Sequence, residues 1–201
     1  MNGKIANVAT VKEQQVIFSF MTLGHNTFLQ RLIGAVSLDV AIYEEVEADR
    51  TATGQAFAVV ILSSVAAGIG SRGFGAASPG TIVAMTVAAV LGWAAWALVT
   101  LQIGGRLMPE PQTQVDIGEL LRTIGFATAP GMVRIVGIIP VATYPAYVIS
   151  AVWMLCTMIV AVRQALDYTS TLRAVIVCGI GWLLFLAITG ILGLLFASPV
   201  S

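Results

Sequence analysis

The sequence contains little charge, little histidine and little cysteine, and each shortage excludes a class of protein. Only 10% of the 201 residues are charged, against about 25% in soluble domains, so much of the surface must face lipid. Ten basic and ten acidic residues cancel, whereas nucleic-acid binders show a basic excess. Two cysteines and one histidine exclude a disulfide framework and a zinc finger. With 58% hydrophobic residues and a mean hydropathy of +0.92, a membrane protein is expected.

Long uncharged runs predict where the chain crosses the bilayer. A helix needs about 20 mostly apolar residues to cross a hydrocarbon core of about 30 Å. The stretch between Arg122 and Arg163, interrupted by the single charge of Arg134, is long enough for two crossings, and Pro140 and Pro145 provide the break between them. The sequence therefore predicts an all-α integral membrane protein with an N-terminal arm (1–50) and a five-span domain (51–197). The five transmembrane helices are expected at about 53–71, 81–103, 120–140, 145–163 and 174–197.

The distribution of Lys and Arg predicts the orientation, because cytoplasmic loops are enriched in both residues. One side of the predicted topology has eight of them, and the other side has Arg72 alone. The eight are Lys4, Lys12, Arg31, Arg50, Arg106, Arg122, Arg163 and Arg173. The N-terminus is therefore expected in the cytoplasm and the short C-terminus outside. The apolar cluster at 16–21 is too short for a signal peptide, and whether residues 1–20 belong to the native protein stays open.

The second half of the arm has the periodicity of an amphipathic helix. Apolar residues recur at helical spacing from Thr27 onward, at Leu29, Leu32, Ile33, Val36, Val40 and Tyr43. Helices that bind anionic lipid carry Lys and Arg on the polar face, but here acidic residues outnumber Arg31 and Arg50. The apolar face is therefore expected to pack on the bundle, to lie in the interface by hydrophobicity alone, or to meet a partner protein.

An acidic cluster ends the arm, at Glu44, Glu45, Glu47 and Asp49. Carboxylates can bind hard cations, but the helical spacing spreads these four over more than one face. The prediction is a solvated helix end that offers a contact surface to a protein partner, with no metal site. The single histidine, His25, precedes all spans, and no Asp or Glu lies inside one. Catalysis needs a nucleophile or metal with a base against it, so no catalytic residue and no cofactor is predicted.

The third predicted span carries both helix breakers and a charge. Pro130 and Gly131 interrupt it, and the kink at Pro130 should leave a carbonyl for which Thr128 or Arg134 is a candidate donor. Arg134 is also a candidate ligand-binding residue for an anion, because a charge at membrane depth points to function. Two structural interpretations stay open for it. Its side chain reaches the outer interface, or it caps carbonyls freed by the break.

Two stretches resemble the YIP domain family of Ypt/Rab-interacting membrane proteins. They are LLRTIGFATAPGMVRIVGIIP (120–140) and VWMLCTMIVAVRQALDYTSTLRAVIV (152–177), similar to the family's third span and its fourth-to-fifth segment. The resemblance covers about residues 50–197 and implies five spans, a cytoplasmic arm, a short outer C-terminus and no catalytic residues. In eukaryotes it implies Golgi, endoplasmic reticulum and vesicle proteins that work with Rab GTPases. The arm is shorter here, and eight Arg against two Lys suggest a bacterial gene, without Rab partners.

The sequence therefore leaves three functions open. The first is a non-enzymatic multi-pass protein of the bacterial inner membrane that organises partners through its arm and cytoplasmic loops, with self-association also open. The second is a small channel or transporter with an anion site at Arg134. The third is an accessory subunit of a larger membrane complex. The lipid bilayer is a partner in each, and nucleic acid in none.

Overall fold

The computed structural model describes residues 26–75 and 78–196, and this part of the chain contains helices and no strand. His25, residues 1–20 and residue 197, where the fifth span was expected to end, lie outside the described residues. The chain divides into two compact units, Met1–Gln30 and Arg31–Ser201. In the first unit, Thr27 donates hydrogen bonds from N and Oγ1 to Oε1 of Gln30. The second unit contains the apolar helices.

The end of the arm is two short helices instead of the single amphipathic helix expected from periodicity. α2 covers Phe28–Val36 and α3 covers Val40–Ala48. Leu38, between them, adopts a φ of 63°, a left-handed conformation that ends a helix. Asp39 then starts α3 by accepting a hydrogen bond from the N–H of Ala41. The chain therefore turns back on itself at Leu38.

Three helices of the described chain are long and apolar enough to cross a membrane: Ala52–Phe74, Ile82–Leu107 and Pro140–Ala165. They correspond to the expected first, second and fourth spans. The first consists of α4 (Ala52–Gly70) and the 3-10 turn η1 (Ser71–Phe74), and the second of α5 (Pro79–Thr100) and the π-helical η2 (Leu101–Leu107). α8 (Thr171–Phe196) occupies the place of the expected fifth span, and its stretch Thr171–Leu184 is a shorter apolar helix.

The expected third span changes its helical geometry in the middle. α6 covers Ile117–Ala127, and the 3-10 helix η3 covers Ala129–Ile138, with Pro130 and Gly131 in its first turn. α6 begins with a capping box in which the side chains of Asp116 and Glu119 each accept a hydrogen bond from the other residue's backbone N–H. At about 1.5 Å and 2.0 Å per residue, α6 and η3 together extend roughly 36 Å.

The fourth expected span starts five residues earlier than predicted. α7 covers Pro140–Ala165, so it begins at the first of the two prolines and not at Pro145. Pro140 occupies a first-turn position, where its missing N–H costs no intrahelical bond. Pro145 lies inside α7 and removes the hydrogen bond that would reach the carbonyl of Val141.

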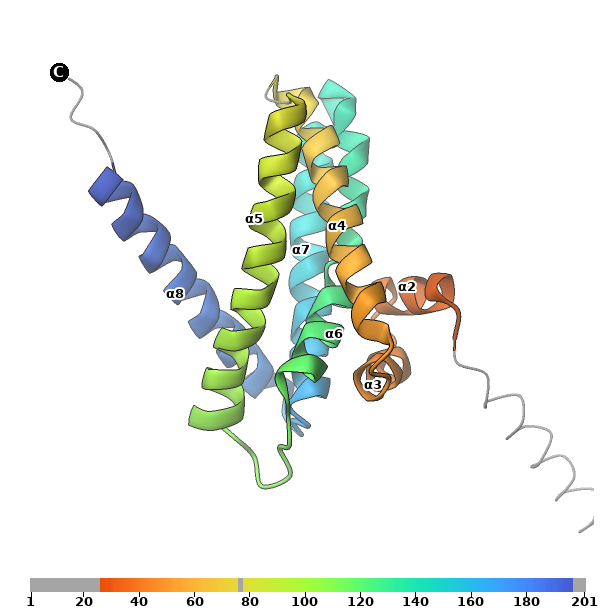
Figure 1. The fold of residues 1–201 in the computed structure, drawn as a ribbon, viewed down its shortest axis with the longest axis vertical. Coiled ribbons are helices and arrows are strands. Elements are labelled where there is room, and N and C mark those ends of the chain that lie inside the picture. Colours follow the sequence, from red (N-terminus) through yellow and green to blue (C-terminus); the bar gives the residue numbers. More distant parts are fainter. Residues whose placement is uncertain (1–25, 76–77, 197–201) are drawn as a thin grey trace, which may run out of the picture. The chain divides into compact units, whose positions relative to one another are not determined.

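Contacts at the two ends show that successive segments run in opposite directions. Tyr168, just after α7, donates to the carbonyl of Gly104 in η2 over 3.0 Å. At the other end, the rings of Phe74 and Tyr144 lie 5.1 Å apart, so η1, which follows α4, lies beside the start of α7. α6 packs against α3, and η3 packs against η1. α4, α5, the α6–η3 segment and α7 therefore form one antiparallel bundle (Figure 1).

Candidate functional site

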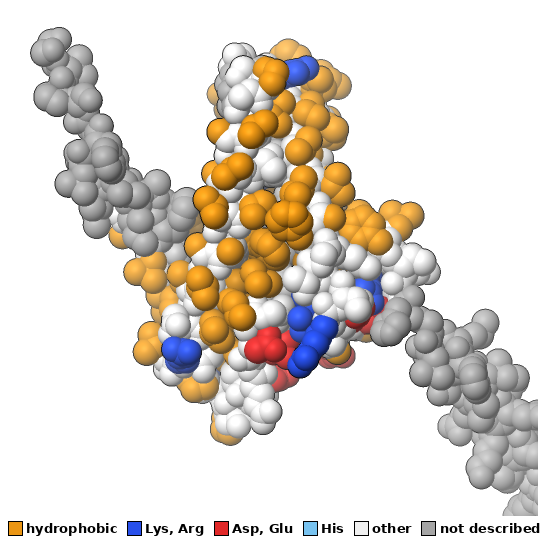
Figure 2. All heavy atoms as spheres, in the orientation of Figure 1, with side chains coloured by type: hydrophobic (Ala, Val, Ile, Leu, Met, Phe, Trp, Pro, Cys, Tyr) orange, Lys and Arg blue, Asp and Glu red, His pale blue; other side chains and the backbone are white. Residues whose placement is uncertain are grey.

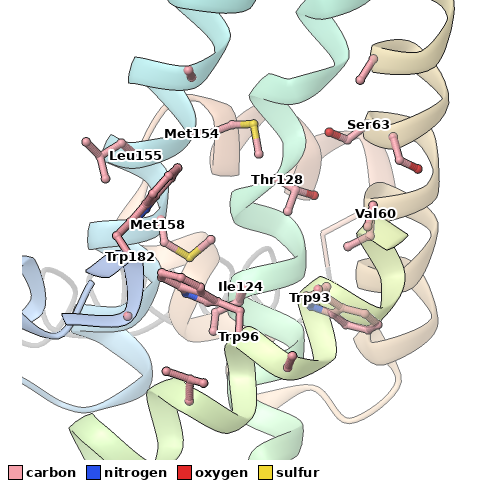
Figure 3. Close-up of a pocket in the computed structure, with 18 of the residues that line it drawn as sticks. Val60, Ser63, Trp93, Trp96, Ile124, Thr128, Met154, Leu155, Met158 and Trp182 are labelled. Atoms are coloured by element: carbon pink, nitrogen blue, oxygen red, sulfur yellow. The ribbon is translucent and has the colours of Figure 1, made fainter. Parts of the chain in front are cut away.

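A cavity of about 580 Å³ lies inside the bundle, bordered by α4, α5, the α6–η3 segment, α7 and α8. Its wall is mainly apolar and rich in soft, polarizable side chains (Figure 3). They come from three helices and include Trp93 and Trp96 from α5, Met154 and Met158 from α7, and Trp182 from α8. Such a wall, with few polar groups, is typical of a ligand pocket.

Among the described residues that line this cavity, Arg134 is the only charged one. Its Nη2 lies 3.3 Å from the sulfur of Met154, and its Cζ lies 5.5 Å from the ring centre of Tyr147. Its Nε is buried and has no hydrogen-bond partner among the described residues. Arg134 takes part in none of the salt bridges that the described residues form. The structure therefore places it at the cavity, against a thioether and an aromatic face.

The carbonyl freed by the break accepts a hydrogen bond from a neighbouring helix, and not from Thr128 or Arg134 as expected. In 3-10 geometry the carbonyl that Pro130 cannot reach is that of Ala127, three residues earlier. Thr157 of α7 donates to it over 2.7 Å. The hydroxyl of Thr128 donates instead to Gly125, in its own helix.

Two glycines let the broken segment approach α4 closely. A Cβ added to Gly125 would lie 2.7 Å from the Cβ of Ala56, and one added to Gly131 would collide with the hydroxyl of Ser63. Small residues of this kind allow helix backbones to meet in lipid, where close packing drives association. The break therefore lies in a tightly packed contact, next to the cavity.

Away from the cavity, residues 31–49 of the arm are held on the bundle by a buried arginine. Arg31 is 1% exposed. Its guanidinium donates to Glu45 from Nε (3.0 Å) and Nη2 (2.8 Å), to Asp49 (2.7 Å) and to Gln55 of α4 (3.0 Å). Most of the charged side chains visible in Figure 2 lie at this end of the bundle. Arg31 thus joins α2, the end of α3 and α4.

A second arginine and a tryptophan hold the same residues of the arm against α6 and α7. Arg122 of α6 is 5% exposed, and its Nε donates to the carbonyls of Val46 (3.0 Å) and Glu47 (2.9 Å). The last carbonyls of a helix have no intrahelical donor, so Arg122 caps the end of α3. Trp153 of α7 donates its indole N–H to the carbonyl of Val36 over 2.8 Å.

Among the carboxylates of the acidic cluster, exposure and bonding differ. Glu45 and Asp49 bind Arg31, and hydrogen bonds from Thr51 and then Arg31 lower the pKa of Asp49 to about 2. Glu44 is exposed and accepts a hydrogen bond from Gln164 of α7 over 3.1 Å. Of these three, only Glu44 fits the solvated helix end that was expected.

Of the four carboxylates, Glu47 lies in surroundings that disfavour its negative charge. Burial raises its pKa to about 7, with the nearby Asp167 and Glu119 adding to the rise and Arg122 opposing it. Its own backbone carbonyl serves as an acceptor for Arg122, which holds the residue in this acidic environment. In the described part of the chain, no group of three or more His, Cys, Asp or Glu residues is placed to hold a metal ion.

The antiparallel apolar helices, the internal cavity and the charged end define an all-helical, multi-pass membrane protein. The chain belongs to the Yip1 domain family, whose model matches residues 40–192. This confirms the resemblance seen in the sequence. The match starts at α3, so the family's domain includes the second helix of the arm. Comparison with curated proteins and with solved structures gives no match.

Proposed function

We propose that this member of the Yip1 domain family is a non-enzymatic, five-span protein of a bacterial inner membrane. In this proposal it organises other proteins at the cytoplasmic face, through the arm and the two cytoplasmic loops. The observation that carries the proposal is the arm itself. Two buried arginines and Trp153 hold residues 31–49 of the arm on the bundle, and a preorganised surface binds partners at a lower entropic cost.

Five spans are supported by the direction of the segments. α6 and η3 extend roughly 36 Å, enough for a hydrocarbon core of about 30 Å, and they run between the same two ends as α4 and α7. α8 starts at the end of the bundle where the arm lies, because Arg173 pairs with Glu110 at 3.3 Å in the loop between η2 and α6. The positive-inside rule then assigns this end to the cytoplasm.

The exposed side of the arm combines apolar and acidic groups. Ile33 is 58% exposed and Val40 is also exposed, although both precede the first span. Glu44 is exposed on the next turn of α3. An acidic surface repels anionic headgroups, so a protein partner with apolar and basic groups is favoured over the lipid surface.

A photo-crosslinking amino acid placed at Ile33 or Val40 of the full chain, in native membranes, tests this proposal. The matched control position is Val141, which is 85% exposed at the opposite end of the bundle. We expect protein adducts from Ile33 and Val40, and lipid adducts from Val141. The yield of protein adducts should fall when Glu44→Lys weakens binding of the partner to this surface. Lipid adducts alone from the two arm positions would show that the arm lies in the interface, and the proposal would be wrong.

The alternative, a small channel or carrier with an anion site at Arg134, has one observation in its favour. Arg134 faces a cavity with a buried Nε that lacks a partner among the described residues. Anion flux in reconstituted vesicles that disappears in Arg134→Gln would support this alternative. Vesicles containing the unmodified chain that pass no anion would exclude it.

A further inference from the structure

We propose that the cavity binds a long-chain fatty acid, with its carboxylate on Arg134 and its hydrocarbon chain along α5. This site is separate from the cytoplasmic surface proposed above, and it stands or falls independently of that surface. Three observations carry it: the length of helix that lines the cavity, the lack of a charged partner for Arg134 among the described residues, and the nature of the opening.

The residues that line the cavity extend along the bundle far enough for one hydrocarbon chain. Its lining positions on α5 run from Met85 to Val99, which corresponds to about 21 Å of helix. Two acyl chains end to end make up a hydrocarbon core of about 30 Å, so one chain extends roughly 15 Å. The volume of about 580 Å³ is that of a site for one small molecule. One extended chain with its head group therefore fits the length.

The charge of Arg134 calls for one anion. A charge at membrane depth is expensive unless it is paired, and neither the sulfur of Met154 nor the ring of Tyr147 carries a negative charge. The buried Nε has no partner in the part of the chain that the structure describes. A guanidinium offers two parallel N–H groups that match the two oxygens of a carboxylate. A fatty acid supplies that group with a single charge.

The opening of the cavity points to the lipid phase as the source of the ligand. The lining residues that remain exposed include Leu155 of α7 and Trp182 and Leu184 of α8; Figure 3 shows Leu155 and Trp182 on the same side of the cavity. All three are apolar and belong to helices placed in the bilayer. A ligand that passes them arrives from hydrocarbon, which favours a lipid over a free aqueous anion.

Quenching of tryptophan fluorescence by a brominated fatty acid tests the assignment. The full chain in phosphatidylcholine nanodiscs is titrated with dibromostearate, and in parallel with its uncharged methyl ester, at a pH where the acid is ionised. Three of the four tryptophans line the cavity, so a bound chain quenches most of the signal. We expect saturable quenching by the acid with an affinity about tenfold or more above that of the ester, because a charged hydrogen bond is lost in the ester. Arg134→Gln should remove this difference.

A cavity-filling variant keeps the test independent of Arg134. A Cβ added to Gly92, which lines the cavity, meets no atom within 4 Å, and the same is true of Gly179, which lies outside it. Gly92→Leu should weaken quenching by the acid about fivefold or more, because an isobutyl group then occupies the site, while Gly179→Leu should bind like the unmodified chain. Equal quenching by acid and ester, or unchanged binding in Gly92→Leu, would overturn the proposal. Displacement of the acid by acetate would also overturn it, since the site would then serve small aqueous carboxylates.

Discussion

Replacing Arg31 with Met should release the arm from the bundle. Met keeps an unbranched apolar stem, but it removes the guanidinium that binds Glu45, Asp49 and Gln55. Glu45 and Asp49 would then face each other with only 22% and 11% of their side chains exposed. Their mutual repulsion and their poor hydration both disfavour the docked state, so the end of α3 should move away from the bundle into water.

The magnitude follows from burial. Removing one partner of a fully buried ion pair costs about 3–5 kcal/mol. The two carboxylates retain some contact with water, so we expect Arg31→Met to lower the free energy of unfolding by about 2–4 kcal/mol. Arg50→Met is the matched control, because Arg50 belongs to the same arm and is exposed. Exposed substitutions of this kind change the free energy of unfolding by about 0.5 kcal/mol or less.

The assay is reversible unfolding of the purified chain in mixed micelles, combined with limited proteolysis of the arm. A double-mutant cycle with Asp49→Asn should give a coupling energy of about 1–3 kcal/mol, since the two side chains share a direct ion pair. Arg31→Met should also increase cleavage between α2 and α4 while the apolar helices stay protected. A loss equal to that of Arg50→Met, with no coupling to Asp49, would refute the view that this ion-pair network holds the arm.

Two further predictions concern Glu47 and the break between α6 and η3. The pKa of Glu47 in the folded chain is raised from 4.5 to about 7, so the folded chain holds this proton more tightly than the unfolded chain. The free energy of unfolding should therefore fall as the pH rises from about 4.5 to 7. In unfolding titrations, Glu47→Gln should reduce this fall by about 1–2 kcal/mol. An identical pH profile in Glu47→Gln would contradict this. Thr157→Val leaves the carbonyl of Ala127 without its donor and should cost about 1 kcal/mol in micelle unfolding. Thr86→Val, whose hydroxyl bonds only a carbonyl of its own helix, is the control, and an equal cost in both variants would contradict the role of Thr157.

The apolar helices could be predicted from the sequence because the bilayer imposes a minimum length on each uncharged run. That constraint is local, so the positions of α4 and α5 follow from counting residues between arginines. The partner of the Ala127 carbonyl could not be found in this way. It is a threonine 30 residues away, and threonine is common in membrane helices. Only the packing of α7 against α6 selects Thr157 from the other hydroxyls.

The turn at Leu38 shows a different limit. Periodicity places the apolar residues from Leu29 to Tyr43 on one helical face. The sequence has no glycine or proline at the break, and leucine rarely adopts a positive φ, so nothing at residue 38 itself predicts the turn. Asp39 is the signal that was available, because Asp is a preferred N-cap residue and here it caps α3. The burial of Arg31 depends on this turn. Without it, α3 could not bring Glu45 and Asp49 to the same guanidinium.

The same contacts explain why the family's match begins at residue 40, before the first span. Tyr43 and Val46 of α3 are fully buried, and burial of each such side chain is worth about 1.5–3 kcal/mol. Arg122 of α6 depends on the carbonyls of Val46 and Glu47 for its hydrogen bonds. A domain that began at residue 51 would expose the surface beneath these side chains and leave a buried guanidinium without acceptors. The physical unit therefore includes α3, so this last part of the arm belongs to the folded membrane domain.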